Sequence, residues 1–358
     1  MFRFISGGCN KAPSSTMNAI HCASPPPPPF SLPPAKGGGI GSQGNRLFVF
    51  GVGFVGRYVS NQLLKQGWRV SGTCTCPVRK RELEMMGMHD SFLFDANKNE
   101  LESLHTLKDA THVLISIPPL SGLGDPLLTL HHKDLQSTLN HGNLQSLCYL
   151  SSTMYFCGAG VYGDCGGAWV DEDSAVNPAT ETAKARYAAE KGWQQLGCEL
   201  DVPVNIFRLG GIYGCGRSAI NTILQQKSLS REQKMRETKL YTARVHVADI
   251  YQALCASFNL SSSSGRVYNV VDDDPAPREV VFDFARDLIE KRWPEQAIAF
   301  RAQDKAEDTE FSHKSRKIGE EKRVSNVRIK KELGVRLLYP SYKSGLENIL
   351  NSMYDDHS

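Results

Sequence analysis

Acidic residues are missing from the first 81 positions, which nevertheless hold ten lysines and arginines. The rest of the chain carries 31 basic and 38 acidic side chains, a net charge of −7. A mildly acidic body lacks the concentrated basic face of a nucleic-acid clamp. The chain also lacks an uninterrupted apolar run of about 18 residues, the length that spans a bilayer. We therefore expect no nucleic-acid partner and no membrane partner.

Cysteine is also sparse. Ten cysteines in 358 residues are too few for a disulfide scaffold, and Cys74 and Cys76 have no second pair to complete a zinc site. We expect the cysteines to be mostly reduced and buried, and we expect no metal. The length corresponds to about two domains of about 150 residues each. A content of 41% hydrophobic and 22% charged residues is typical of a globular protein with a sizeable core.

Residues 1–44 differ from the rest of the chain. They are rich in serine, contain the proline run Pro25–Pro29 and show no apolar period of 2 or 3.6. Such a segment buries too little apolar surface to offset the entropy lost on ordering. Serine enrichment without acidic residues is typical of an organellar transit peptide, and the absence of an arginine-rich amphipathic helix favours the chloroplast stroma over the mitochondrion. A disordered proline-rich tail that carries no address is the alternative.

A glycine-rich turn follows the first apolar run, Arg46–Phe50. Gly51, Gly53 and Gly56 have the spacing G-x-G-x-x-G, and apolar residues then recur at helical spacing up to Gly67. A strand before this motif and a helix after it form the context in which it indicates dinucleotide binding. The first glycine permits the tight turn, the second leaves room for the pyrophosphate, and the third lets the helix pack closely on the strand. The start of the helix then supplies partial positive charge for the phosphates.

Further alternation of strand and helix patterns predicts a parallel sheet built from βαβ units. The predicted strands after the first are Trp68–Gly72, Phe92–Phe94, Val113–Ile117, Leu147–Leu150 and Val204–Phe207. We assign cofactor binding to residues in the glycine turn and near the strand ends. These residues are Gly51, Gly53, Phe54, Val55, Gly56, Thr73, Arg79, Asp95, Ser116 and Pro118.

The end of the second predicted strand bears on the choice of cofactor. Proteins that bind NAD usually carry an aspartate or glutamate there, which accepts a hydrogen bond from the ribose 2′-hydroxyl. Neither is present in Thr73–Thr75, and the basic run Arg79–Arg81 follows. The positive charges of this run would attract a 2′-phosphate, so we predict NADP. NAD is the alternative, in which case the run is a solvated helix start.

Five motifs in this order resemble the extended short-chain dehydrogenase/reductases, the NAD-dependent epimerase/dehydratase superfamily. They are the glycine turn, Ser151–Thr153, Gly160–Asp164, Phe207–Gly214 and Arg244–Ile250. Gly166–Glu172 is similar to the atypical branch of that superfamily, and the leader suggests a plant plastid-type member. The resemblance implies an α/β fold: a Rossmann doubly wound parallel sheet with a smaller, mostly C-terminal substrate lobe.

The resemblance also divides the chain. Residues 1–44 are the transit peptide, residues 45–209 plus 241–271 form the NAD(P)-binding domain, and residues 210–240 plus 272–358 form the substrate lobe. The expected ligand besides the cofactor is a small polar or sugar-like molecule. A homodimer is compatible with this family.

The family chemistry uses a serine or threonine hydroxyl, a tyrosine as general acid/base, and a lysine one helical turn later. Ser152 and the adjacent Thr153 provide the hydroxyl. Six residues, 154–159, intervene where the family pattern continues directly, at the lip of the expected pocket. Tyr162 or Tyr213 would be an alternative source of a phenol, although both more often line the pocket.

The tyrosine and lysine slots are ambiguous. Counting from Pro178 by the family frame puts Thr182 in the tyrosine slot and Arg186 in the lysine slot. Threonine has no phenol to titrate, and arginine keeps its charge, so this pair is not equivalent to the family's. A literal Tyr-x-x-x-Lys occurs five residues later, at Tyr187 and Lys191, about 140° away around the helix. Both registers remain candidates for catalysis.

Two single polar residues and one acidic run are further candidates for a functional role. His246 alternates with apolar neighbours as in a strand, so we expect a packed, hydrogen-bonded side chain. Asp249 is expected to cap a helix over residues 250–258, and Asp272–Asp274 to form a solvated turn rather than a metal site.

Two functions follow from these features. The first is an NADP-dependent oxidoreductase or epimerase/dehydratase-like enzyme, supported by the glycine turn and Ser152. The second is a catalytically degenerate NADP-binding sensor or assembly factor, supported by the altered tyrosine and lysine slots.

Overall fold

A computed structural model describes residues 44–98, 100–140, 143–152, 160–225, 241–258, 265–294 and 321–355. The expectations for the leader up to residue 43, for the insertion 154–159 and for residues 226–240 lie outside these ranges. The six predicted strands all form, with ends shifted by two residues or fewer.

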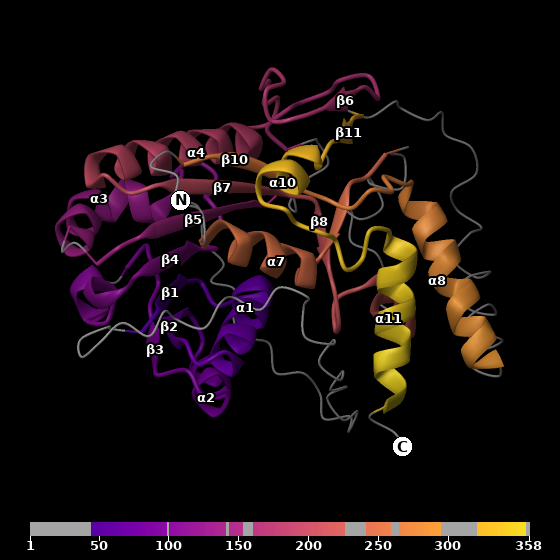
Figure 1. Ribbon diagram of the computed structural model, residues 1–358, viewed down its shortest axis with the longest axis horizontal. Helices are drawn as coiled ribbons and strands as arrows, with labels where there is room; N and C mark the ends of the chain where they lie inside the picture. The colour runs from indigo at the N-terminus through magenta and orange to yellow at the C-terminus, as the bar shows by residue number, and fades with distance from the viewer. Residues whose placement is uncertain are drawn as a thin grey trace, which may run out of the picture.

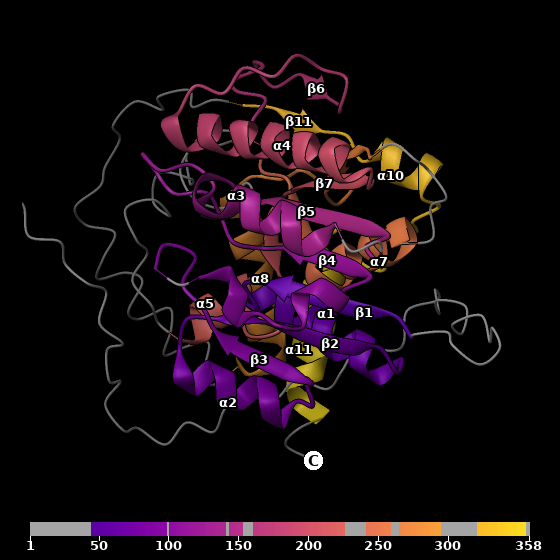
Figure 2. The same cartoon turned by 90° about the vertical axis from the view of Figure 1, so that its left-hand side faces the viewer.

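A seven-stranded sheet, parallel in every pairing, forms the centre of the fold (Figure 1). Its order is β10-β7-β5-β4-β1-β2-β3, and Figure 2 shows the strands from β7 to β3 stacked in this order. The strands are β1 (Arg46–Phe50), β2 (Arg69–Cys74), β3 (Asp90–Leu93), β4 (His112–Ile115), β5 (Ser146–Ser152), β7 (Val204–Leu209) and β10 (Val267–Val270). The chain order reverses between β1 and β4, which is the crevice where such sheets bind ligands. The predicted Rossmann α/β fold is confirmed.

Helices cover both faces of the sheet, so its strands are apolar on both sides. In β1, Leu47 and Val49 pack into one hydrophobic cluster while Phe48 and Phe50 pack into the opposite one. The first cluster includes side chains from α1 (Phe54–Lys65), α2 (Pro77–Met85), α7 (Val247–Phe258) and α10 (Val327–Glu332). The second includes side chains from α3 (Pro126–Leu139) and α4 (Glu181–Leu200).

A third hydrophobic cluster lies beyond the sheet, where α8 and α11 stand side by side in Figure 1. It joins α5 (Ala219–Leu224), α8 (Arg278–Arg292) and α11 (Tyr342–Asp355). Two small parallel sheets complete the described fold: β8 (Gly211–Tyr213) with β9 (Arg244–His246), and β6 (Trp169–Val170) with β11 (Arg323–Val324).

The cysteines follow their expectation only in part. Cys148 and Cys255 are buried free thiols, and burial raises their pKa to about 11 and about 12. Cys198 is a free thiol exposed on α4, and Cys215 is disulfide-bonded. Within the described residues, no helix is long and apolar enough to cross a membrane.

Candidate functional site

The glycine turn is fixed to the neighbouring strands. Gly51 has φ +84°, a conformation that favours glycine, and a Cβ there would lie 2.9 Å from Ile117 Cγ1. The Gly51 N–H donates to Thr73 Oγ1 over 2.8 Å, and the Val52 N–H donates to the Thr73 carbonyl over 2.8 Å. Thr73 is buried, so its hydroxyl positions the turn on β2.

The other two glycines have different surroundings: Gly56 is in close contact with the turn, whereas Gly53 borders open space. A Cβ on Gly56 would lie 3.0 Å from the Gly51 carbonyl oxygen, so α1 packs directly against the turn. A Cβ on Gly53 would have no heavy atom within 4 Å. No side chain caps α1 at Gly53, and the first turn carries no acidic residue. The start of α1 therefore keeps the partial positive charge that attracts a phosphate.

Two arginines converge beyond the end of β2. Arg79, in the first turn of α2, and Arg57, on α1, both place a guanidinium nitrogen 3.4 Å from Glu82 Oε2. Their side chains are 41% and 50% exposed, so these ion pairs stabilise the fold by about 1 kcal/mol at most. Sequence reasoning missed Arg57, although it directly follows the last glycine of the motif.

The remaining cofactor candidates lie on loops after β3 and β4. Asp95 accepts hydrogen bonds from the Asn97 N–H and Nδ2, which hold its pKa below the usual range. The Ser116 N–H donates to the Phe50 carbonyl over 2.9 Å, and Pro118 is exposed. Both loops therefore lie at the carboxyl edge of the sheet.

The two candidate catalytic pairs on α4, Thr182/Arg186 and Tyr187/Lys191, lie on different faces of the helix. Arg186 is buried against the sheet, one turn beyond the partly buried Thr182. Tyr187 instead packs with Tyr162 in a separate small cluster beside β6. Lys191 is exposed, and its ammonium lies 5.5 Å from the centroid of the Tyr187 ring. Only the Thr182/Arg186 pair therefore lies on the sheet-facing side of α4.

A buried ion pair stands beside the end of β5. Arg208 on β7 donates to both carboxylate oxygens of Glu190 on α4, with distances of 2.8–3.3 Å. The Ser151 hydroxyl donates to Glu190 Oε1 over 2.6 Å. Ser152, the last residue of β5, directly follows Ser151 and pairs in the sheet with Leu209, the residue after Arg208. Thr153 lies outside the described residues.

The two alternative phenols occupy different surroundings. The Tyr162 hydroxyl donates to Asn269 Oδ1 over 2.7 Å, and the Arg208 guanidinium lies 4.9 Å from its ring centroid. The Tyr213 hydroxyl is buried and has no hydrogen-bond partner among the described residues. Burial raises the pKa of both phenols, and the nearby Asp272 carboxyl raises that of Tyr213 further.

The expectations for His246 and Asp249 have opposite outcomes. His246 is packed as predicted: its Nδ1 accepts the Ala248 N–H, and burial lowers its pKa to about 3. The predicted Asp249 cap is wrong, because α7 begins two residues earlier, at Val247. Asp249 instead accepts the N–H groups of Leu338 and Tyr339, over 2.6 and 3.3 Å, and anchors the C-terminal segment.

The predicted solvated turn is also wrong for Asp272, which is 4% exposed. Its backbone N–H donates to the Arg244 carbonyl, which ties the residue to β9 beneath the third cluster. Both carboxylate oxygens lack a hydrogen-bond partner in the described part of the chain. Burial and then the Asp274 charge raise its pKa to about 8, against the lowering effect of Arg244.

We expect Asp272→Asn to change how stability depends on pH. The folded protein keeps the Asp272 proton up to about pH 8, whereas the unfolded chain loses it near pH 3.9. The contribution of Asp272 to the free energy of unfolding is therefore fully present below about pH 4. It is lost as the pH rises to about 8, because only the unfolded chain releases the proton in this range. The advantage of the variant over wild type should grow across this window to a few kcal/mol, measured by urea unfolding at pH 4, 6 and 8. Asp283→Asn, at an exposed position, is the control, and parallel curves for Asp272→Asn would refute the shift.

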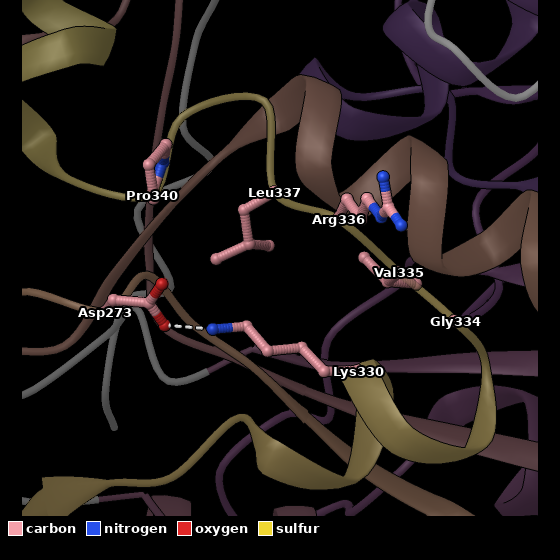
Figure 3. Close-up of a pocket in the computed structure, with 7 residues that line it drawn as sticks. All are labelled: Asp273, Lys330, Gly334, Val335, Arg336, Leu337 and Pro340. Atoms are coloured by element: carbon pink, nitrogen blue, oxygen red, sulfur yellow. Dashed lines mark hydrogen bonds and ion pairs between the residues drawn. The ribbon is translucent and has the colours of Figure 1, made fainter.

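A shallow hollow of about 450 Å³ opens beside α10 (Figure 3). Its lining includes none of the expected cofactor-binding residues. Lys330 and Asp273 meet inside it at 2.5 Å, so their charges compensate each other. Figure 3 shows the Arg336 guanidinium pointing away from this pair. Among the described residues, no group of three histidine, cysteine, aspartate or glutamate side chains could hold a metal ion.

Comparison with known proteins supports the fold. No family model matches the chain. It is 24% identical over 299 residues to Protein YeeZ of Escherichia coli (strain K12), covering 82% of this chain and 96% of that one. It is also similar to the solved structure of a functionally unknown conserved protein from Silicibacter pomeroyi DSS, with 31% identity, a TM-score of 0.63, and coverage of 86% of this chain and 98% of that one.

A third similar structure is the UDP-glucuronic acid 4-epimerase from Bacillus cereus in complex with NAD. It has 17% identity, a TM-score of 0.60, and coverage of 87% of this chain and 97% of that one. The solved UDP-glucose and UDP-glucuronic acid 4-epimerases therefore share the fold of this chain. The chain itself belongs to the same family as the Silicibacter pomeroyi protein.

Proposed function

We propose that this chain binds NADP, in preference to NAD, and acts as an oxidoreductase or epimerase-like enzyme on a small polar or sugar-like substrate. The open side of Gly53, facing the uncapped start of α1, carries the proposal. Backbone N–H groups and the helix dipole at this point suit a pyrophosphate and need no basic side chain. When bound, the nicotinamide would supply or accept a hydride.

The residues of this chain would hold the cofactor along the carboxyl edge of the sheet. Gly51, Gly53 and the first turn of α1 would bind the pyrophosphate. Asp95 would face the adenine side, since it follows β3 at the far end of the sheet. Ser116 and Pro118 would border the middle of the dinucleotide, after β4. Ser152 at the end of β5 would orient a substrate oxygen.

The arginines beyond β2 support NADP. Arg57 and Arg79 share one weak, exposed partner, Glu82, which a 2′-phosphate would replace with little loss. Arginine also binds phosphate through paired N–H groups.

We expect Arg79→Ala and Arg57→Ala each to weaken NADPH binding about tenfold and to leave NADH binding unchanged, because only NADPH carries the extra phosphate. Fluorescence titration of the purified chain with each cofactor measures this difference. Lys80→Ala is the matched control, since Lys80 pairs with Glu84 further along α2. Equal losses for both cofactors would contradict the preference for NADP, and no binding of either by wild type would defeat the proposed function.

The second candidate, a catalytically degenerate NADP-binding sensor or assembly factor, rests on the sheet-facing pair Thr182 and Arg186. Neither side chain can replace a titrating phenol beside a lysine. Oxidation of bound NADPH by any member of a panel of carbonyl compounds and nucleotide sugars would favour the enzyme. Tight cofactor binding without turnover across the panel would favour the sensor.

For location, we propose the stroma of the chloroplast, as for a plant plastid-type member. The composition of the leader, serine-rich and free of acidic residues, supports this location.

A further inference from the structure

Arg186 is a buried cation without a counter-charge among the described residues. The residue is 5% exposed and lies on the side of α4 that faces the sheet. Among the described residues, no hydrogen bond or ion pair involves its guanidinium. Within the described part of the chain, the only group whose charge is coupled to it is the phenol of Tyr149, which is itself fully buried. Burial lowers the pKa of Arg186, as expected of a cation removed from water.

The two carboxylates whose charges act on the same Tyr149 phenol, Glu190 and Asp125, have other partners. Glu190 accepts three hydrogen-bond contacts from Arg208, in addition to the hydroxyl of Ser151. Asp125 accepts the indole N–H of Trp193 over 2.8 Å and two backbone N–H groups at the start of α3. The charge of Arg186 is therefore uncompensated within the described fold, a condition that costs stability unless a ligand relieves it.

The guanidinium is nonetheless not fully enclosed. Fully enclosed polar atoms that lack a partner in the described residues include Tyr149 Oη and Arg208 Nη1. No atom of Arg186 is among them, so its nitrogens keep contact with accessible space.

The position of Arg186 indicates which ligand would reach it. Helix α4 connects the parallel strands β5 and β7, so it runs antiparallel to them. Its first turns therefore lie at the carboxyl edge of the sheet. Arg186 is in the second turn of α4, near the end of β5 at Ser152. The pyrophosphate would lie at the other side of the crevice, at β1 and α1.

We propose that Arg186 binds an oxyanion of the substrate, a carboxylate or a phosphate, so that the chain selects acidic substrates over neutral ones. The fork of N–H donors in arginine matches two oxygens of one such group, and an anion compensates the charge as neutral hydroxyls cannot. The substrate assignment rests on the proposed function, which places the substrate beside Ser152. The anion site itself does not.

Thermal unfolding with malonate as the probe tests this proposal. Arg186→Met should unfold at least about 4 °C above wild type without malonate, because an uncompensated buried charge is removed. Malonate should raise the wild-type midpoint above that in sodium chloride of equal ionic strength, and should have no such effect on Arg186→Met. Lys191→Met, at an exposed position on the same helix, should respond like wild type.

Arg186→Lys keeps the charge without the fork, and should bind malonate about tenfold more weakly than wild type. A lower midpoint for Arg186→Met, with the wild-type malonate response retained in Arg186→Lys, would make Arg186 a structural cation and overturn the proposal. Malonate stabilisation that persists at saturating NADPH supports a substrate anion, whereas its loss would assign the site to a cofactor phosphate and overturn the substrate assignment. A malonate response without any NADPH binding would defeat the proposed function and leave the anion site standing.

Discussion

Gly53→Asp should abolish binding of NADPH and NADH, by a factor of at least about 100, while the protein remains fully folded. Gly53 has φ −84°, which any residue adopts, and an added Cβ would meet nothing within 4 Å. The new carboxylate would therefore enter the space that the pyrophosphate needs. It would also repel the phosphates and occupy the N–H groups at the start of α1.

The same substitution should raise the stability of the protein without cofactor by about 0.3 kcal/mol, because aspartate caps a helix slightly better than glycine does. Loss of binding with a gain in stability separates a blocked site from a damaged fold. Gly44→Asp is the matched control, since a Cβ at Gly44 also meets nothing within 4 Å. Fluorescence titration and urea unfolding measure the two effects, and retained affinity in Gly53→Asp would exclude the turn as the cofactor site.

The glycine turn was predictable because all its determinants are local. Strand, turn and helix lie within about 20 residues, and the spacing of Gly51, Gly53 and Gly56 encodes both the positive φ and the close approach of α1. The buried strands were predictable for the same reason, since each reads as a short apolar run.

The groups around the turn depend on contacts between distant segments. Arg57 and Glu82 are 25 residues apart, and only the packing of α1 beside α2 brings them together. Asp249 meets Leu338 across 89 residues, so no local pattern distinguishes this contact from a helix cap. Asp272 begins a run of three aspartates, yet the Arg244 backbone draws only this one into the interior.

Helix α4 marks the limit of motif reasoning. Tyr187 and Lys191 have the spacing of the family's catalytic pair, and the sequence alone left them in competition with Thr182 and Arg186. Spacing states which residues share a helix face, but not which face meets the sheet. The contacts of Glu190 with Arg208 and Ser151 orient the helix, and Arg186, one turn earlier, then faces β5.

That orientation leads to the largest expected change in stability. Glu190→Gln should lower the free energy of unfolding by about 3–5 kcal/mol, because Arg208 would keep a buried charge with no carboxylate to compensate it. Both side chains are almost completely shielded, at 2% and 7% exposure, and Arg208 Nη1 already lacks a partner among the described residues. Urea unfolding of the purified variant measures the loss.

An exposed pair on the same helix provides the contrast. Glu181 and Lys184 lie 2.9 Å apart but are 80% and 56% exposed, so Glu181→Gln should change stability by less than about 0.5 kcal/mol. The double variant Glu190→Leu/Arg208→Leu should lose less than the sum of the two single substitutions, since it leaves no unpaired charge behind. Equal losses of stability for Glu190→Gln and Glu181→Gln would mean that solvent reaches the Glu190–Arg208 ion pair. In that case the Glu190 carboxylate would not be fully used by Arg208 and Ser151, and it could compensate the charge of Arg186 as well.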